Sequence, residues 1–109
     1  MPSLSTADHA TSPPQVAFAL NYNAAHDLIF RNLEAGRAHK PAFIDDEATI
    51  TYGELERRSA AAAHALVSLG VQREQRVLLC LQDTIDFPVA FLGAIRAGIV
   101  PVAVNTLLT

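Results

Sequence analysis

The sequence predicts an α/β fold, in which a strand, a helix and a second strand follow one another in the last third of the chain. Residues 77–81 are five apolar residues without alternation, which is typical of a parallel strand covered on both faces. Residues 87–97 repeat apolar side chains at helical spacing, and Gly98 follows where a left-handed C-cap glycine belongs. Residues 99–104 are a second apolar run, rich in β-branched residues. Together these segments predict a right-handed βαβ unit.

The composition limits the classes of protein to which the chain can belong. The 109 residues allow one small domain, and a content of 50% hydrophobic and 17% charged residues is that of a globular chain. The net charge of −3 provides no basic surface, so nucleic acid is not expected as a partner. The chain has no apolar run near the ~18 residues that span a bilayer and no secretory signal pattern. We therefore expect a cytoplasmic protein without a membrane span.

The N-terminal residues carry little apolar side chain to bury. Residues 1–15 consist mainly of Ser, Thr, Ala and Pro, and we expect them to form a disordered leader. His9 lies within this leader and is expected to be a solvated side chain. Residues 16–22 alternate apolar with small or polar residues and could dock loosely on the body of the domain. Residues 16–109 are then the structured part.

A first helix is predicted over residues 24–35. Asn23 can cap its start, Asp27 lies in its first turns, and Gly36 stands just past its end. Its expected buried stripe is Leu28, Ile29 and Leu33. A short basic cluster follows, for which a solvated connection is the default interpretation and phosphate binding the alternative: Arg37, His39 and Lys40.

A β-hairpin is predicted next, with strands at residues 40–45 and 49–52. Its turn carries three acids, Asp45, Asp46 and Glu47, which raise the question of acid/base chemistry or a metal site. Adjacent acids at a hairpin tip point in different directions and usually stay in water. We therefore assign them no function.

A second helix begins at residues 51–54, which have the S/T-x-x-E form of a capping box. It ends at Gly70, and its expected buried face is Leu55, Ala62, Leu66 and Leu69. His64 is expected at or near the surface rather than as a catalytic base. Cys80, in the first strand of the βαβ unit, is interpreted as a small core residue, and as the only cysteine it cannot form an internal disulfide.

The loop at residues 82–86 lies at the carboxyl end of a parallel strand, where ligands bind in open α/β sheets. Thr84 or Asp86 can cap the following helix, and the loop lacks the glycines that cradle phosphates. We expect a structural role for it. The chain also lacks the common nucleotide, zinc and serine-hydrolase motifs, so the sequence predicts no catalytic, cofactor-binding or metal-binding residue.

The predicted sheet has too few elements to cover its apolar faces. One interpretation is that the chain is the N-terminal part of a larger α/β protein, incomplete at its C-terminal end and inactive alone. The other is a free-standing small α/β domain that completes its sheet by dimerisation or by binding a partner.

Particular segments carry a resemblance to a known family. The helix start at residues 51–55 (TYGEL), the stop at residues 69–71 (LGV) and the A-x-x-A-G end leading to Val102 and Asn105 follow in order. This order resembles the opening of the large N-terminal domain of adenylate-forming enzymes, which include acyl-CoA synthetases, adenylation domains and luciferases. Residues 21–25, 83–88 and 105–109 resemble the same segments of benzoate-CoA and 4-hydroxybenzoate-CoA ligases.

The resemblance implies a two-step reaction for the complete protein. A carboxylate such as benzoate attacks the α-phosphate of MgATP, and the thiol of coenzyme A then displaces AMP. The family supplies its phosphate loop, ribose-binding aspartate and catalytic lysine from motifs that do not occur in this sequence, so no site residue is carried over. The alternative substrate is a fatty acid or an amino acid. The complete protein could also form a homodimer.

Overall fold

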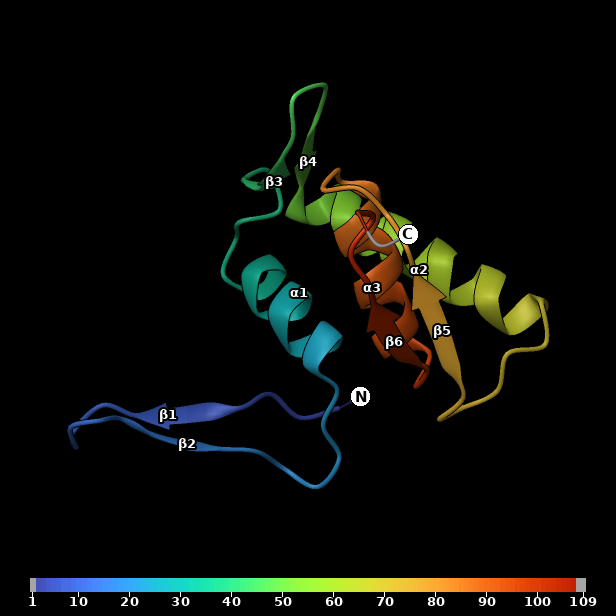
Figure 1. The fold of residues 1–109 in the computed structure, drawn as a ribbon. Helices are drawn as coiled ribbons and strands as arrows, with labels where there is room; N and C mark the ends of the chain where they lie inside the picture. The colour runs from blue at the N-terminus through green and yellow to red at the C-terminus, as the bar shows by residue number, and fades with distance from the viewer. Residues whose placement is uncertain (1, 108–109) are drawn as a thin grey trace.

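The computed structural model describes residues 2–107. The three helices pack together, and Figure 1 shows the strands around them. In chain order the elements are β1 (Thr6–Asp8), β2 (Gln15–Ala17), α1 (Ala24–Glu34), β3 (Pro41–Ile44), β4 (Thr49–Thr51), α2 (Tyr52–Ser68), β5 (Arg76–Leu79), α3 (Asp86–Arg96) and β6 (Val100–Ala103).

The predicted βαβ unit is confirmed. β5 and β6 pair in parallel, from Arg76 opposite Val100 to Leu79 opposite Ala103, and α3 is the crossover between them. Gly98 ends the helix in the left-handed region, with φ of +75°, which an L side chain rarely adopts. The predicted hairpin is also present, since β3 and β4 pair antiparallel in a separate two-stranded sheet.

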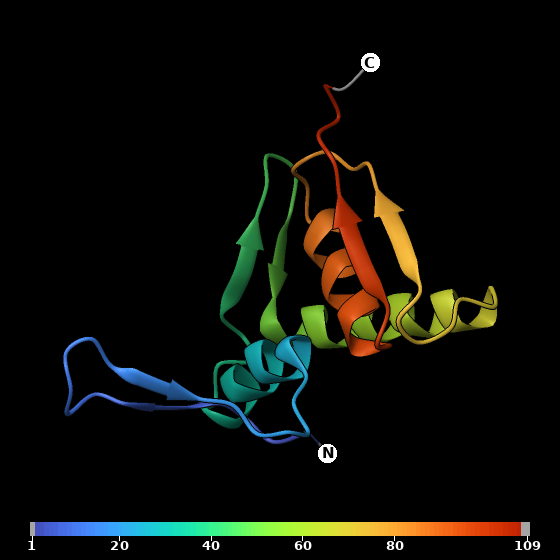
Figure 2. The same ribbon diagram turned by 60° about the horizontal axis from the view of Figure 1, so that its bottom comes forward.

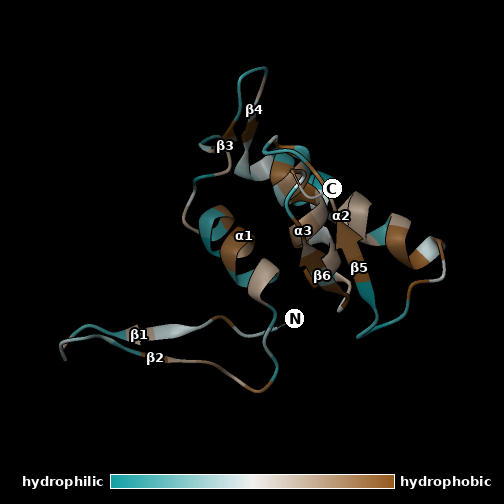
Figure 3. Ribbon diagram, viewed as in Figure 1, coloured by the Kyte–Doolittle hydropathy of each residue, from teal (hydrophilic) through white to brown (hydrophobic). Residues whose placement is uncertain are grey.

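The β5/β6 pair is covered on one face and open on the other. Figure 2 shows α3 behind the two strands, and Figure 3 shows that the strands are mostly apolar. Leu78 is nevertheless 65% exposed, Val100 43% and Val102 36%. Within residues 2–107, α3 is the helix that packs on β5 and β6, so the pair is covered on one face rather than on both. The prediction that the sheet has too few elements to cover its apolar faces is confirmed for these residues.

The core lies where the three helices meet and is built from six buried side chains. It consists of Ala25, Ile29, Ile50, Leu55, Val89 and Leu92. The capping box of α2 is formed as predicted, because Thr51 Oγ1 accepts from the Glu54 N–H and Glu54 Oε2 accepts from the Thr51 N–H. A local sequence signal thus fixes where α2 begins.

Three expected core residues lie elsewhere. Leu28 is 59% exposed on α1, and Leu69 is 80% exposed at the C-cap of α2, past the last turn that packs on α3. Cys80 is exposed because β5 ends at Leu79, one residue earlier. Periodicity predicted the helices correctly, but it could not show where the covering layer stops.

The N-terminal residues differ from the expected disordered leader. β1 and β2 form an antiparallel hairpin that extends away from the helices, with Thr6 opposite Ala17 and Asp8 opposite Gln15. All six strand residues are exposed. Apolar burial therefore does not stabilise this hairpin, and for that reason the composition did not predict it. Backbone pairing and the polar contacts described below stabilise it instead.

No helix within residues 2–107 is long and apolar enough to cross a membrane.

Candidate functional site

The loop at residues 82–86 and the groove beside it are the candidate site, because they lie at the carboxyl end of β5. The loop is held by its own turns: the Thr84 N–H donates to the Gln82 carbonyl at 2.8 Å and the Phe87 N–H to the Thr84 carbonyl at 3.1 Å. Ile85 occupies the N-cap position of α3 and provides no side-chain cap. The predicted caps are thus not at this position, although Thr84 Oγ1 accepts from the Asp86 N–H at 3.3 Å.

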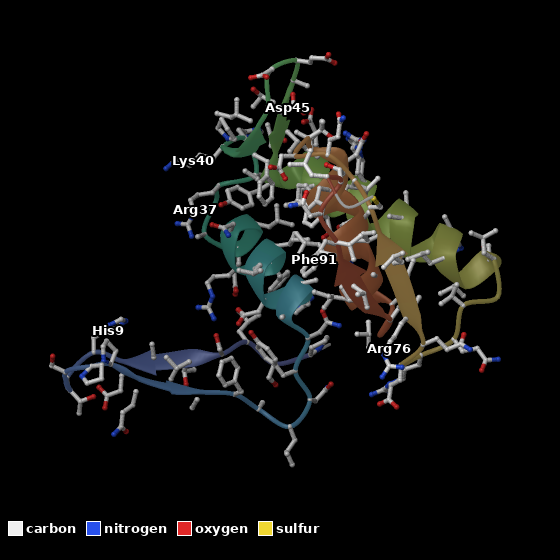
Figure 4. All side chains as sticks on the ribbon, in the orientation of Figure 1. His9, Arg37, Lys40, Asp45, Arg76 and Phe91 are labelled. Atoms are coloured by element: carbon white, nitrogen blue, oxygen red, sulfur yellow. The ribbon has the colours of Figure 1, made fainter. Side chains whose placement is uncertain are left out.

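An apolar groove of about 370 Å³ opens between the β3/β4 hairpin, α1 and the start of α3. Phe87 and Phe91 line one wall as a stacked pair with ring centroids 5.8 Å apart, while Leu28 and Phe43 line the others. Figure 4 shows Phe91 between α1 and α3, and Asp45 farther along on the hairpin. The exposure of Leu28 is explained by this groove, which α1 borders.

Asp45 joins the hairpin to the loop. Its Oδ2 accepts from the Ile85 N–H at 2.9 Å, and its Oδ1 accepts from the N–H groups of Glu47 and Ala48, each at 2.8 Å. These hydrogen bonds, that from Ile85 first, lower the pKa of the Asp45 carboxyl below its usual range. Nothing in the sequence distinguishes Asp45 from the other two hairpin acids, because its partner Ile85 lies 40 residues away.

A second polar cluster lies at the base of the N-terminal hairpin. Asp27, only 5% exposed, accepts from Ser5 Oγ at 2.6 Å, from the Tyr22 hydroxyl at 2.7 Å and from Arg31 at 2.8 Å. Burial alone would raise the pKa of Asp27, but the hydrogen bonds from Ser5, Tyr22 and Arg31 outweigh it and hold the pKa far below its usual range. The hydrogen bond that the Tyr22 hydroxyl donates to Asp27 raises the pKa of Tyr22. Because every group is paired, we interpret the cluster as an anchor rather than a reactive site.

The remaining singled-out residues form no site. His9 lies far out on the N-terminal hairpin, and Arg37 and Lys40 lie on the connection between α1 and β3, as Figure 4 shows. Arg37 donates to Asn32 Oδ1 at 2.9 Å, which supports the solvated-connection interpretation over phosphate binding. His64 is exposed on α2.

The side chains around the loop at residues 82–86 do not fit a nucleoside triphosphate or its metal ion. Carboxylates border the loop, at Asp45, Asp83 and Asp86, and would repel phosphates. The Ile85 N–H, a donor that could serve an anion, is already bonded to Asp45. Within residues 2–107, no group of three His, Cys, Asp or Glu side chains could hold a metal ion. We therefore derive no catalytic step from these side chains.

Comparison with known proteins identifies the family of the chain. Residues 30–109 match the model of the AMP-binding enzyme family. The chain is 53% identical over 110 residues to the benzoate-CoA ligase of Thauera aromatica, covering all of this chain and 21% of the relative. It is 53% identical over 89 residues to the 4-hydroxybenzoate-CoA/benzoate-CoA ligase of Rhodopseudomonas palustris, covering 82% of this chain and 16% of the relative.

A solved structure is similar as well. The benzoate CoA ligase from Burkholderia xenovorans LB400 superimposes with a TM-score of 0.77 at 53% identity, covering 81% of this chain and 18% of that one. The chain thus spans about a fifth of the length of the relatives that it matches. The expected α/β architecture of the adenylate-forming N-terminal domain is confirmed, and this chain belongs to the AMP-binding enzyme family.

Proposed function

We propose that this chain forms the opening section of the AMP-binding domain of an aromatic acid-CoA ligase, and that it serves there as scaffold. The observation that carries the proposal is the 53% identity to a benzoate-CoA ligase along the entire chain. The open apolar face of β5/β6 supports it, because that face needs a covering layer and the relatives have the additional length to supply one.

The proposed overall reaction converts benzoate, ATP and coenzyme A to benzoyl-CoA, AMP and diphosphate. A carboxylate oxygen of benzoate bonds to the α-phosphorus and diphosphate leaves; the thiolate sulfur of coenzyme A then bonds to the acyl carbon and AMP leaves. Mg²⁺ would supply charge neutralisation on the phosphates. Residues 2–107 contribute no group that fits this chemistry. Their proposed role is to support the parts of the complete domain that carry the catalytic groups. ATP and coenzyme A as substrates favour a cytoplasmic enzyme.

The alternative function is a small non-enzymatic α/β domain that covers its apolar face by forming a homodimer. The open apolar face of β5/β6 is the observation that supports this alternative. A monomeric chain that unfolds cooperatively and does not bind an apolar dye would contradict both interpretations of that face.

A chimaeric enzyme tests the scaffold role. This chain replaces the matching segment of the Thauera benzoate-CoA ligase, and benzoate-dependent AMP release is measured beside the parent enzyme and a deletion that lacks the segment. We expect the chimaera to work at a rate close to the parent's, and the deletion and the isolated chain to be inactive. A folded but inactive chimaera would contradict the proposal.

The substrate requires a different assay, because the chimaera's acid pocket belongs to the parent. The protein translated from the complete reading frame is assayed for AMP release with benzoate, 4-hydroxybenzoate and a long-chain fatty acid. Preference for an aromatic acid is expected, and preference for the fatty acid would transfer the chain to another branch of the family.

A further inference from the structure

Asp45 is placed to do more than shape its own turn. The carboxylate uses both oxygens: Oδ1 serves two N–H groups of the hairpin tip, and Oδ2 reaches across to the Ile85 N–H. The hairpin and the loop at residues 82–86 share no sheet, since β3/β4 and β5/β6 are separate two-stranded sheets. Asp45 is thus a polar link between two elements that backbone pairing leaves unconnected.

The link also completes the start of α3. Thr84 accepts from the N–H groups of Asp86 and Phe87, and Pro88 has no N–H. The Ile85 N–H at the N-cap position therefore takes its acceptor from outside this segment. Asp45 provides that acceptor, and its negative charge lies at the positive end of the helix dipole. The hairpin thus supplies the acceptor for the N–H group at the N-cap position of α3.

The linked segments form opposite walls of the apolar groove. Phe43 and Ile44 line it from β3, whereas Ile85, Phe87 and Pro88 line it from the loop and α3. Asp45 and Ile85 themselves belong to the lining of the groove, so their hydrogen bond joins the wall from the hairpin to the wall from the loop.

We propose that Asp45 is a positioning residue, which locks the hairpin tip and the loop at residues 82–86 into one unit and so fixes the shape of the groove and of the carboxyl edge of β5. This rests on the proposed function for its relevance to an aromatic acid-CoA ligase, in which that edge would face the layers that complete the domain. The lock itself is a property of this chain.

Amide hydrogen exchange on the 109-residue chain tests the lock. Asp45→Ala is compared with Asp45→Asn, which keeps an acceptor oxygen, and with Asp46→Ala, which removes the neighbouring exposed acid. We expect exchange of peptides covering residues 82–88 to be about tenfold faster in Asp45→Ala, intermediate in Asp45→Asn and unchanged in Asp46→Ala. Peptides from the middle of α2 should be unaffected in all three.

Two outcomes would overturn the proposal: equal exchange of residues 82–88 in Asp45→Ala and the wild type, including absence of protection in both, or a uniform increase over the whole chain, which would indicate a general loss of stability. The same variants are then introduced into the chimaera, where AMP release should fall in Asp45→Ala, recover in part in Asp45→Asn and stay unchanged in Asp46→Ala. An inactive parent chimaera would count against the proposed function alone, because the exchange result is independent of activity.

Discussion

Two contacts in this molecule depend on different interactions. Close packing of small residues joins α2 to α3, whereas hydrogen bonds and an ion pair attach the N-terminal hairpin to α1. The two helices approach so closely that a Cβ placed on Gly93 would lie 2.7 Å from the Ala62 Cβ and 2.9 Å from the Ser59 carbonyl oxygen. The hairpin, whose strand residues are all exposed, is instead attached through the buried carboxylate of Asp27. One contact depends on shape and the other on charge and hydrogen bonds, so they should respond to different perturbations.

The largest effect is expected from adding a methyl group to the helix contact. Gly93→Ala should lower the free energy of unfolding by about 3 kcal/mol, because neither Ala62 nor Ser59 can move away without separating the helices. Urea unfolding followed by circular dichroism measures it. Gly36→Ala is the matched control: Gly36 has φ of +81° with no atom within 4 Å of the added Cβ, so only backbone strain of about 1 kcal/mol is expected. Equal losses would show that packing does not set the helix contact.

A smaller and pH-dependent effect is expected from the anchor. Asp27→Asn should lower the free energy of unfolding by about 2 kcal/mol at neutral pH, because charged hydrogen bonds to Ser5, Tyr22 and Arg31 are weakened. Since folding lowers the pKa of Asp27, its stabilisation is complete above the ordinary aspartate pKa near 4 and is lost as the pH falls from there toward the folded pKa. Unfolding midpoints between pH 7 and pH 2 should therefore fall less steeply in the variant. Parallel curves would contradict the anchor.

The smallest effect is expected from the ion pair that connects α2 to α3. Both terminal nitrogens of the Arg96 guanidinium, Nη1 and Nη2, donate to the Glu56 carboxylate, whose side chain is 38% exposed. A double-mutant cycle with Glu56→Gln and Arg96→Gln should give a coupling of about 1 kcal/mol, reduced by added salt. A coupling near zero would leave Gly93 as the determinant of that interface.

Local signals in the sequence predicted the fold well. The capping box set the start of α2, glycines past the helix ends took the left-handed conformation, and apolar runs predicted both parallel strands. Each of these signals operates within a few residues, so one sequence is enough to interpret it.

The contacts that organise the candidate site were not predictable in this way. Asp45 reaches Ile85 across 40 residues, Ser5 reaches Asp27 across 22, and Glu56 reaches Arg96 across 40. In the sequence, each acid looked like a solvated or dipole-facing side chain. Their partners depend on how the elements pack, which apolar periodicity does not specify. The open face of β5/β6, in contrast, was predictable, because the sequence contains too few elements to cover both faces of the sheet.

Fragment complementation tests the scaffold account most directly. The 109-residue chain is mixed with a separately produced remainder of the Thauera benzoate-CoA ligase, and benzoate-dependent AMP release is followed together with binding of an apolar dye to the chain. The account predicts no AMP release from either piece alone, AMP release from the mixture, and loss of dye binding as the open face of β5/β6 becomes covered. AMP release by the isolated chain, or a stable complex that stays inactive, would contradict it.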